Sequence, residues 1–89
     1  MINNIELYGF LHAGWHQTEI ITAQNGDKTI YQGKCSNSNG LVSEPIWSIK
    51  RMTITTVGDT QTVVEQFADG DMKFDNIWER RTELTYKYL

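Results

Sequence analysis

The chain has 89 residues, a formal net charge of −3 and one cysteine, Cys35. This length predicts a single domain, residues 1–89, that buries only about 60 to 65 per cent of its unfolded surface. A lone cysteine excludes an internal disulfide as extra support. Self-association or docking on a larger assembly is the remaining ordinary route to stability. The three Trp, four Tyr and three Phe suit either such contacts or the filling of a small core.

Charge and hydropathy exclude several classes of protein. The eight basic residues are dispersed among eleven acidic ones, which argues against a basic groove for nucleic acid. No apolar run approaches the roughly 20 residues that a membrane-spanning helix needs. The start of the chain has neither a basic region nor a continuous apolar region of the export-signal type, so we expect synthesis in a cytoplasm and no membrane contact.

The amino-terminal third contains one weak and one strong strand signal. Ile2 to Phe10 alternates weakly and predicts a first strand. The segment Glu19 to Gln32 predicts a hairpin, because Asn25-Gly26 lies between two β-favouring runs and suits a two-residue type I′ turn. That turn would place Ile21 opposite Ile30 and Ile20 opposite Tyr31.

His12, His16 and Cys35 are the residues here that could carry chemistry. Two histidines four apart could share a helix face and bind zinc, but Gly14 lies between them and no further ligand is near, so loop or edge histidines are expected. Cys35 begins a polar, glycine-bounded loop. A nucleophilic thiol would need His12 or His16 within reach in space. The alternative is a small, partly buried thiol.

The stretch Pro45 to Thr56 predicts the central strand, because it is the longest run of β-branched and apolar residues. Trp47 and Ile49 share one side, whereas Met52 and Ile54 share the other. The change of side indicates either a bulge at Lys50-Arg51 or a strand covered on both faces. Val57 to Thr60 predicts a turn and Thr62 to Phe67 a strand that completes a second hairpin.

The end of the chain changes to helical spacing. Phe74, Ile77, Trp78 and Arg81 predict a short helix over 75–82, begun by Asp75 or by Asn76 with Glu79 as a capping box. Alternation over 84–88 then predicts a closing strand. The fold class is therefore mainly β: a small antiparallel β-sandwich or barrel of five to seven strands with one short C-terminal helix.

Two constellations allow a functional and a structural interpretation. Asp69-Gly70-Asp71 with Asp75 resembles a fragment of a calcium loop, but a turn followed by a helix cap explains it without an ion. Basic residues beside Trp47 and Trp78 could bind single-stranded nucleic acid. An arginine stacked over a tryptophan and paired with a carboxylate, closing the helix onto the sheet, fits the acidic total better. Without a catalytic set, we expect no enzyme, no metal and no cofactor.

From about Tyr31 to Tyr86 the chain resembles a family of short, uncharacterised proteins of tailed bacteriophages. The residues that carry the resemblance follow in order: Gly33 after Tyr31; Trp47, Ile49 and Arg51; Ala68-Asp69-Gly70-Asp71; Phe74-Asp75-Asn76-Ile77-Trp78; Arg81; and Leu84-Thr85-Tyr86. Residues 1–30 carry no such match and form the variable part beside this family-like core, residues 31–86. The chain departs from the family at Glu79-Arg80, where an Asp-Asp pair is more usual, and it continues through Lys87-Tyr88-Leu89.

The resemblance implies a bacteriophage virion structural protein, a tail, fibre-associated or head-decorating component, that self-associates and docks on other virion proteins. Its localisation would be the virion, after synthesis in the bacterial cytoplasm. The alternative is an intracellular binding module, either for single-stranded nucleic acid or as an inhibitor of a host protein. The residues expected to hold the fold and its contacts are Trp47, Arg51, Asp69, Gly70, Phe74, Asp75, Trp78, Arg81 and Tyr86.

Overall fold

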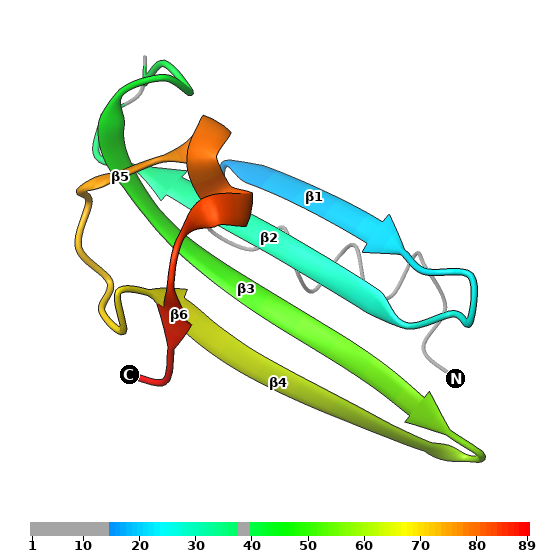
Figure 1. The fold of residues 1–89 in the computed structure, drawn as a ribbon. Coiled ribbons are helices and arrows are strands. Elements are labelled where there is room, and N and C mark those ends of the chain that lie inside the picture. The colour runs from blue at the N-terminus through cyan, green and yellow to red at the C-terminus, as the bar shows by residue number, and fades with distance from the viewer. Residues whose placement is uncertain (1–14, 38–39) are drawn as a thin grey trace.

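The computed structural model of the protein describes residues 15–37 and 40–89 (Figure 1). The predicted strand over Ile2 to Phe10 and His12 lie outside the described residues. The described elements are β1 Gln17–Thr22, β2 Lys28–Cys35, β3 Pro45–Val57, β4 Thr60–Ala68, β5 Asn76–Ile77, the 3₁₀ helix η1 Trp78–Glu83 and β6 Tyr86–Lys87.

The strands form one six-stranded antiparallel sheet. Five follow the order β1-β2-β3-β4-β6, and β5 pairs with residues 45–47 at the start of β3. The prediction of a mainly β antiparallel fold with one short C-terminal helix is confirmed. Strand count does not distinguish a sandwich or a barrel from a single sheet. In the described part of the chain the sheet stays open, because β1 pairs only with β2.

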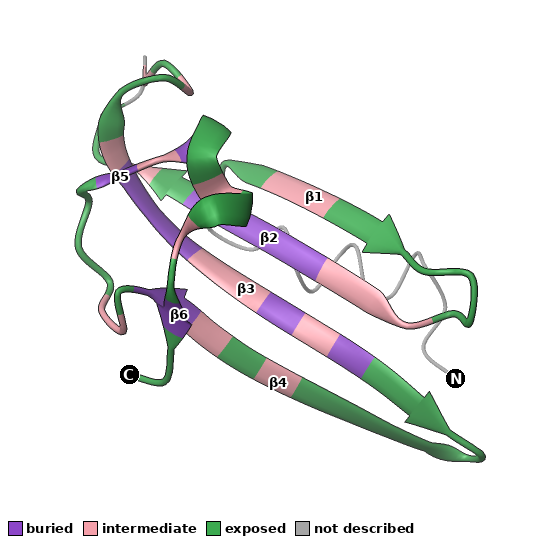
Figure 2. Cartoon of the chain, in the orientation of Figure 1, coloured by how far each residue is buried: buried purple, intermediate pink, exposed green. Residues whose placement is uncertain are grey.

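Strand β3 is central, as predicted, and is covered on both faces. Its pairing with β2 and β4 runs without a register shift through Lys50 and Arg51, so there is no bulge at that point. Ile49 is buried on one face with Trp47, and Met52 is buried on the other with Ile54. Buried stretches lie along the middle of the sheet, in β2 and β3 (Figure 2). The change of side in the sequence therefore reflects two buried clusters on opposite faces of one strand.

The first hairpin exists, but the predicted turn and register were wrong. Ile20 lies opposite Ile30 and Ile21 opposite Thr29. Only Gly26 has positive φ, +92°, and the Gly26 amide donates to the Ala23 carbonyl at 2.9 Å, so the loop spans three residues and is not type I′. The Asn25 carboxamide oxygen accepts from the Asp27 amide at 3.0 Å, which stabilises the longer loop.

The second hairpin has the predicted turn. Val57 pairs with Thr60 across the two-residue loop Gly58-Asp59, and Gly58 has the positive φ, +58°, that such a loop requires.

The C-terminal segment, residues 76–87, crosses one face of the sheet (Figure 1). The predicted α-helix over 75–82 is a 3₁₀ helix over Trp78–Glu83. The capping assignment was also wrong: Ile77 precedes the helix without a side-chain cap, and Asn76 is buried in β5. Pairing of β5 with β3 holds these residues extended, which delays the helix by three residues. The closing strand is short, Tyr86–Lys87. No helix among the described residues is long and apolar enough to cross a membrane.

Replacement of Gly26 tests the revised turn. We expect Gly26→Ala to lower the free energy of unfolding by about 1 kcal/mol, because φ of +92° strains a residue with a Cβ although no atom lies within 4 Å of that position. Chemical denaturation measures the change. Gly26→Asn is the matched control and should lose less, because Asn tolerates positive φ. Equal stability of all three proteins would contradict the turn.

Candidate functional site

The C-terminal segment is held to the sheet by Trp78 seated on Gly33. A Cβ on Gly33 would lie 2.5 Å from Cε3 of Trp78 and 3.0 Å from Cε3 of Trp47, so only glycine leaves room for the indole. The two indole rings are tilted at 38° with centroids 5.8 Å apart, and both side chains are buried. This contact joins β2, β3 and η1 in the larger buried cluster.

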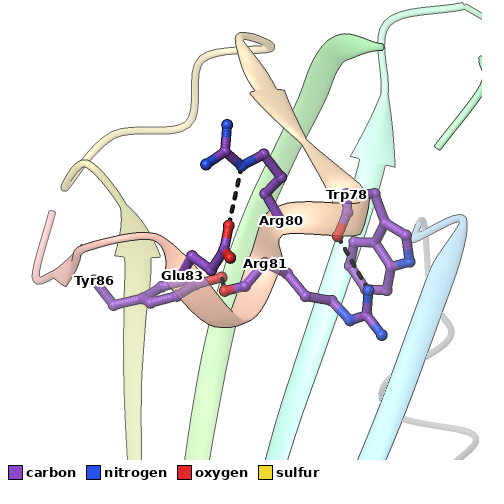
Figure 3. A network of polar contacts seen from close by, with 5 residues as sticks. All are labelled: Trp78, Arg80, Arg81, Glu83 and Tyr86. Atoms are coloured by element: carbon purple, nitrogen blue, oxygen red, sulfur yellow. Dashed lines mark hydrogen bonds and ion pairs between the residues drawn. The ribbon is translucent and has the colours of Figure 1, made fainter. Parts of the chain in front are cut away.

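Arg81 extends this contact to the far edge of the sheet. Its guanidinium lies 4.8 Å from the Trp78 ring and donates to Glu19 of β1 through Nε at 3.0 Å and Nη2 at 2.6 Å. Nη1 donates to the Trp78 carbonyl at 3.1 Å, which fixes the side chain against η1 (Figure 3). The prediction of an arginine stacked over a tryptophan and paired with a carboxylate is confirmed. Glu19 was not identified from the sequence as the partner carboxylate. Its one signal there is that it is the charged residue in the strand Gln17–Thr22.

Tyr86 fastens the other end of the segment. Its hydroxyl donates to the Arg81 carbonyl at 2.7 Å (Figure 3), and its ring lies 4.6 Å from the Arg51 guanidinium and 5.9 Å from the Tyr31 ring. Burial raises the pKa of Tyr86, so the hydroxyl keeps its proton and remains a donor at neutral pH. Arg51 also donates to Gln66 of β4 at 2.8 Å. We call the linked residues Glu19, Gly33, Trp78, Arg81 and Tyr86 the clasp.

The aspartates after β4 form a turn. Asp69 and Gly70 have positive φ, +61° and +74°, and the Asp69 amide donates to the Thr85 carbonyl at 2.8 Å. Asp75 is exposed and accepts from the Asn76 carboxamide at 3.1 Å, whereas Phe74 is 44% exposed. In the described residues no three His, Cys, Asp or Glu side chains gather where they could hold a metal ion.

The structure brings His16 and Cys35 together at the end of β2. Nδ1 of His16 lies 3.3 Å from the Cys35 sulfur and accepts the Cys35 backbone amide at 3.1 Å. The thiol donates to the Asn37 carbonyl at 2.8 Å. The Nδ1 lone pair already accepts the Cys35 backbone N–H, so it is not free to accept the thiol proton. The imidazole therefore holds the end of β2 in place.

Two strand edges remain without a neighbour in the part of the chain that the structure describes. These are the outer edge of β1 and the outer edge of β4 over residues 60–66, since β6 pairs only with Phe67 and Ala68. Neither stretch contains lysine or proline, which proteins commonly place on edges to prevent pairing with other chains, and each contains one charged residue, Glu19 or Glu65. Ile20 and Val63 on these edges are 39% and 47% exposed.

Comparisons of the chain with family models, with curated proteins and with solved structures found no match.

Replacement of Gly33 tests the seat of the clasp. We expect Gly33→Ala to lower the free energy of unfolding by about 1 to 3 kcal/mol, because the added methyl displaces the Trp78 ring from a packed position. Thermal and chemical denaturation measure this loss, and near-ultraviolet circular dichroism should show a changed tryptophan environment. An unchanged near-ultraviolet spectrum together with unchanged stability would contradict the close approach.

The Glu19–Arg81 pair predicts a pH-dependent contribution to stability. Hydrogen bonds from Arg81 lower the pKa of Glu19, so the folded state favours the ionised carboxylate. The stabilisation is therefore complete above the unfolded pKa of Glu19 and is lost as the pH falls through the lowered folded pKa. We expect Glu19→Gln to cost about 0.5 to 1 kcal/mol at pH 7, after allowance for solvent screening, and to differ less from the wild type in acid.

Glu83 supplies the matched control for this pair. It binds Arg80 at 3.0 Å, but both side chains are 64% exposed. Glu83→Gln should therefore cost less stability at pH 7 than Glu19→Gln, because solvent screens an exposed ion pair. A Glu19→Gln protein whose profile parallels that of the wild type across the acid range would show that the clasp pair does not contribute.

Proposed function

We propose that this protein is a non-enzymatic structural component of a bacteriophage particle that acts through self-association and docking on other particle proteins. The observation that carries the proposal is a sheet that stays open in the part of the chain that the structure describes, with outer edges at β1 and over residues 60–66 that contain neither lysine nor proline. Exposed backbone amides and carbonyls along such edges pair readily with a strand of another chain. A structural protein uses this property many times in one particle.

The clasp supports a scaffolding role because it restrains the strands of the sheet relative to one another. Arg81 binds Glu19, which lies 62 positions earlier in the chain, and Trp78 and Tyr86 anchor the same segment to β2 and β3. With β1 held to the C-terminal segment, the sheet offers its edges in a defined geometry. Such pre-organisation lowers the entropy cost of binding.

The bacteriophage assignment draws on the resemblance of residues 31–86 to short proteins of tailed phages. Trp47, Trp78, Arg81 and Tyr86 belong both to that resemblance and to the packing around the clasp. The particle part would be a tail, fibre-associated or head-decorating element, and the partners other virion proteins. The engaged His16 ring at Cys35 supports a structural use of that pair.

Particle composition and sedimentation test the proposal. We expect mass spectrometry of purified particles to detect the protein in multiple copies, and sedimentation velocity of the isolated protein to show species larger than a monomer. Absence from particles, combined with a monomer at all concentrations, would contradict the proposal. A salt-dependent shift of labelled oligonucleotides would instead favour the intracellular binding module.

A further inference from the structure

We infer that the self-association proceeds through β4: a second copy of the chain pairs with residues 60–66 in antiparallel orientation about a two-fold axis at Val63. The inference rests on the proposed function and names the surface through which it acts. It predicts one continuous sheet in which strands β1 to β4 of one copy join those of the other.

The backbone geometry of β4 offers regular hydrogen-bonding groups to a second copy. Thr60 closes the two-residue loop opposite Val57, and this pair exchanges backbone bonds within the hairpin. Bonding alternates along an antiparallel ladder, so Thr62, Val64 and Gln66 also face β3. The amides and carbonyls of Gln61, Val63 and Glu65 consequently point away from β3, along the edge that β6 leaves uncovered.

The tip of the β3–β4 hairpin needs such a neighbour more than the β1 edge does. Strand β2 begins at Lys28 opposite Ile54, so residues 55–57 and 60–62 extend beyond it as a two-stranded ribbon (Figure 1). Val57 at the tip is 80% exposed. A two-stranded ribbon is only marginally stable in water, whereas three or more strands with a buried face are stable. All of β1, in contrast, lies beside β2, which is itself paired with β3.

The chemistry of the edge selects one register. With Val63 opposite Val63 of the second copy, Gln61 lies opposite Glu65 in both directions, and all three outward-facing residues of each copy are used. A register that centred on Glu65 would oppose two carboxylates, which is unfavourable. The negative charge of Glu65 is also offset within its own chain, because Lys50 lies 3.5 Å away.

Strand β6 sets the end of the pairing. Lys87 pairs with Phe67, the position that Asp59 of the second copy would reach in this register. The turn of the second copy therefore has to stop beside β6, which limits the pairing to residues 60–66.

Matched lysine substitutions on the two edges test the inference. We expect Val63→Lys to raise the dimer dissociation constant about tenfold or more in sedimentation equilibrium, because two ammonium groups replace the central apolar pair. Ile20→Lys on the outer edge of β1, at a similarly exposed site, should leave the constant unchanged. Circular dichroism verifies that both variants fold.

A disulfide measurement provides a test that does not depend on weakening the dimer. In a Cys35→Ser background, Val63→Cys should form an inter-chain disulfide under mild oxidation, because directly opposed, hydrogen-bonded residues have Cα atoms about 5.5 Å apart. Ile20→Cys in the same background should stay reduced.

The outcomes separate this inference from the proposed function. An oligomer that persists in Val63→Lys but dissociates in Ile20→Lys would overturn the β4 pairing while self-association stands. A wild-type protein that remains monomeric at every concentration would overturn both. Loss of the dimer in Val63→Lys alone, with cross-linking at residue 63, supports the inferred surface.

Discussion

The fold depends on the contact between the Trp78 indole and Gly33. The absence of a side chain on β2 lets a large ring lie directly on the sheet, where it also packs against Trp47. Trp78 is the buried residue of η1, and a side chain on Gly33 would displace its ring from the sheet. A six-residue 3₁₀ helix has little stability of its own, so its conformation follows from the tertiary contact.

The clasp turns one apolar contact into a connection across the sheet. Arg81 stacks on the indole and pairs with Glu19, while the Tyr86 hydroxyl donates to the Arg81 carbonyl. The segment thus ties β1, an outer strand, to the middle of the fold. Strand β4 is held at its Ala68 end by β6, but residues 60–66 lack a described outer neighbour, which makes this strand the more available of the two for assembly.

The sequence predicted much of the sheet but missed details that depend on competition between alternative hydrogen bonds. Asn25-Gly26 correctly indicated a hairpin, yet the Asn25 side chain bonded Asp27 and favoured a three-residue loop over type I′, which moved the register by one. Asn76 has the chemistry of a helix cap, but pairing with β3 buried it in a strand instead. A hydrogen bond between near neighbours decided the loop, whereas strand pairing between distant residues decided the place of Asn76.

The sequence by itself determined the mainly β class, the central strand with its two apolar sides and the positions of both hairpins, because these depend on alternation and turn chemistry between near neighbours. Only the tertiary structure decided that Glu19 is the partner of Arg81, that Gly33 accommodates Trp78 and that His16 meets Cys35. These contacts join residues far apart in the chain. Their geometry is set by which strands lie side by side, and no local pattern records it.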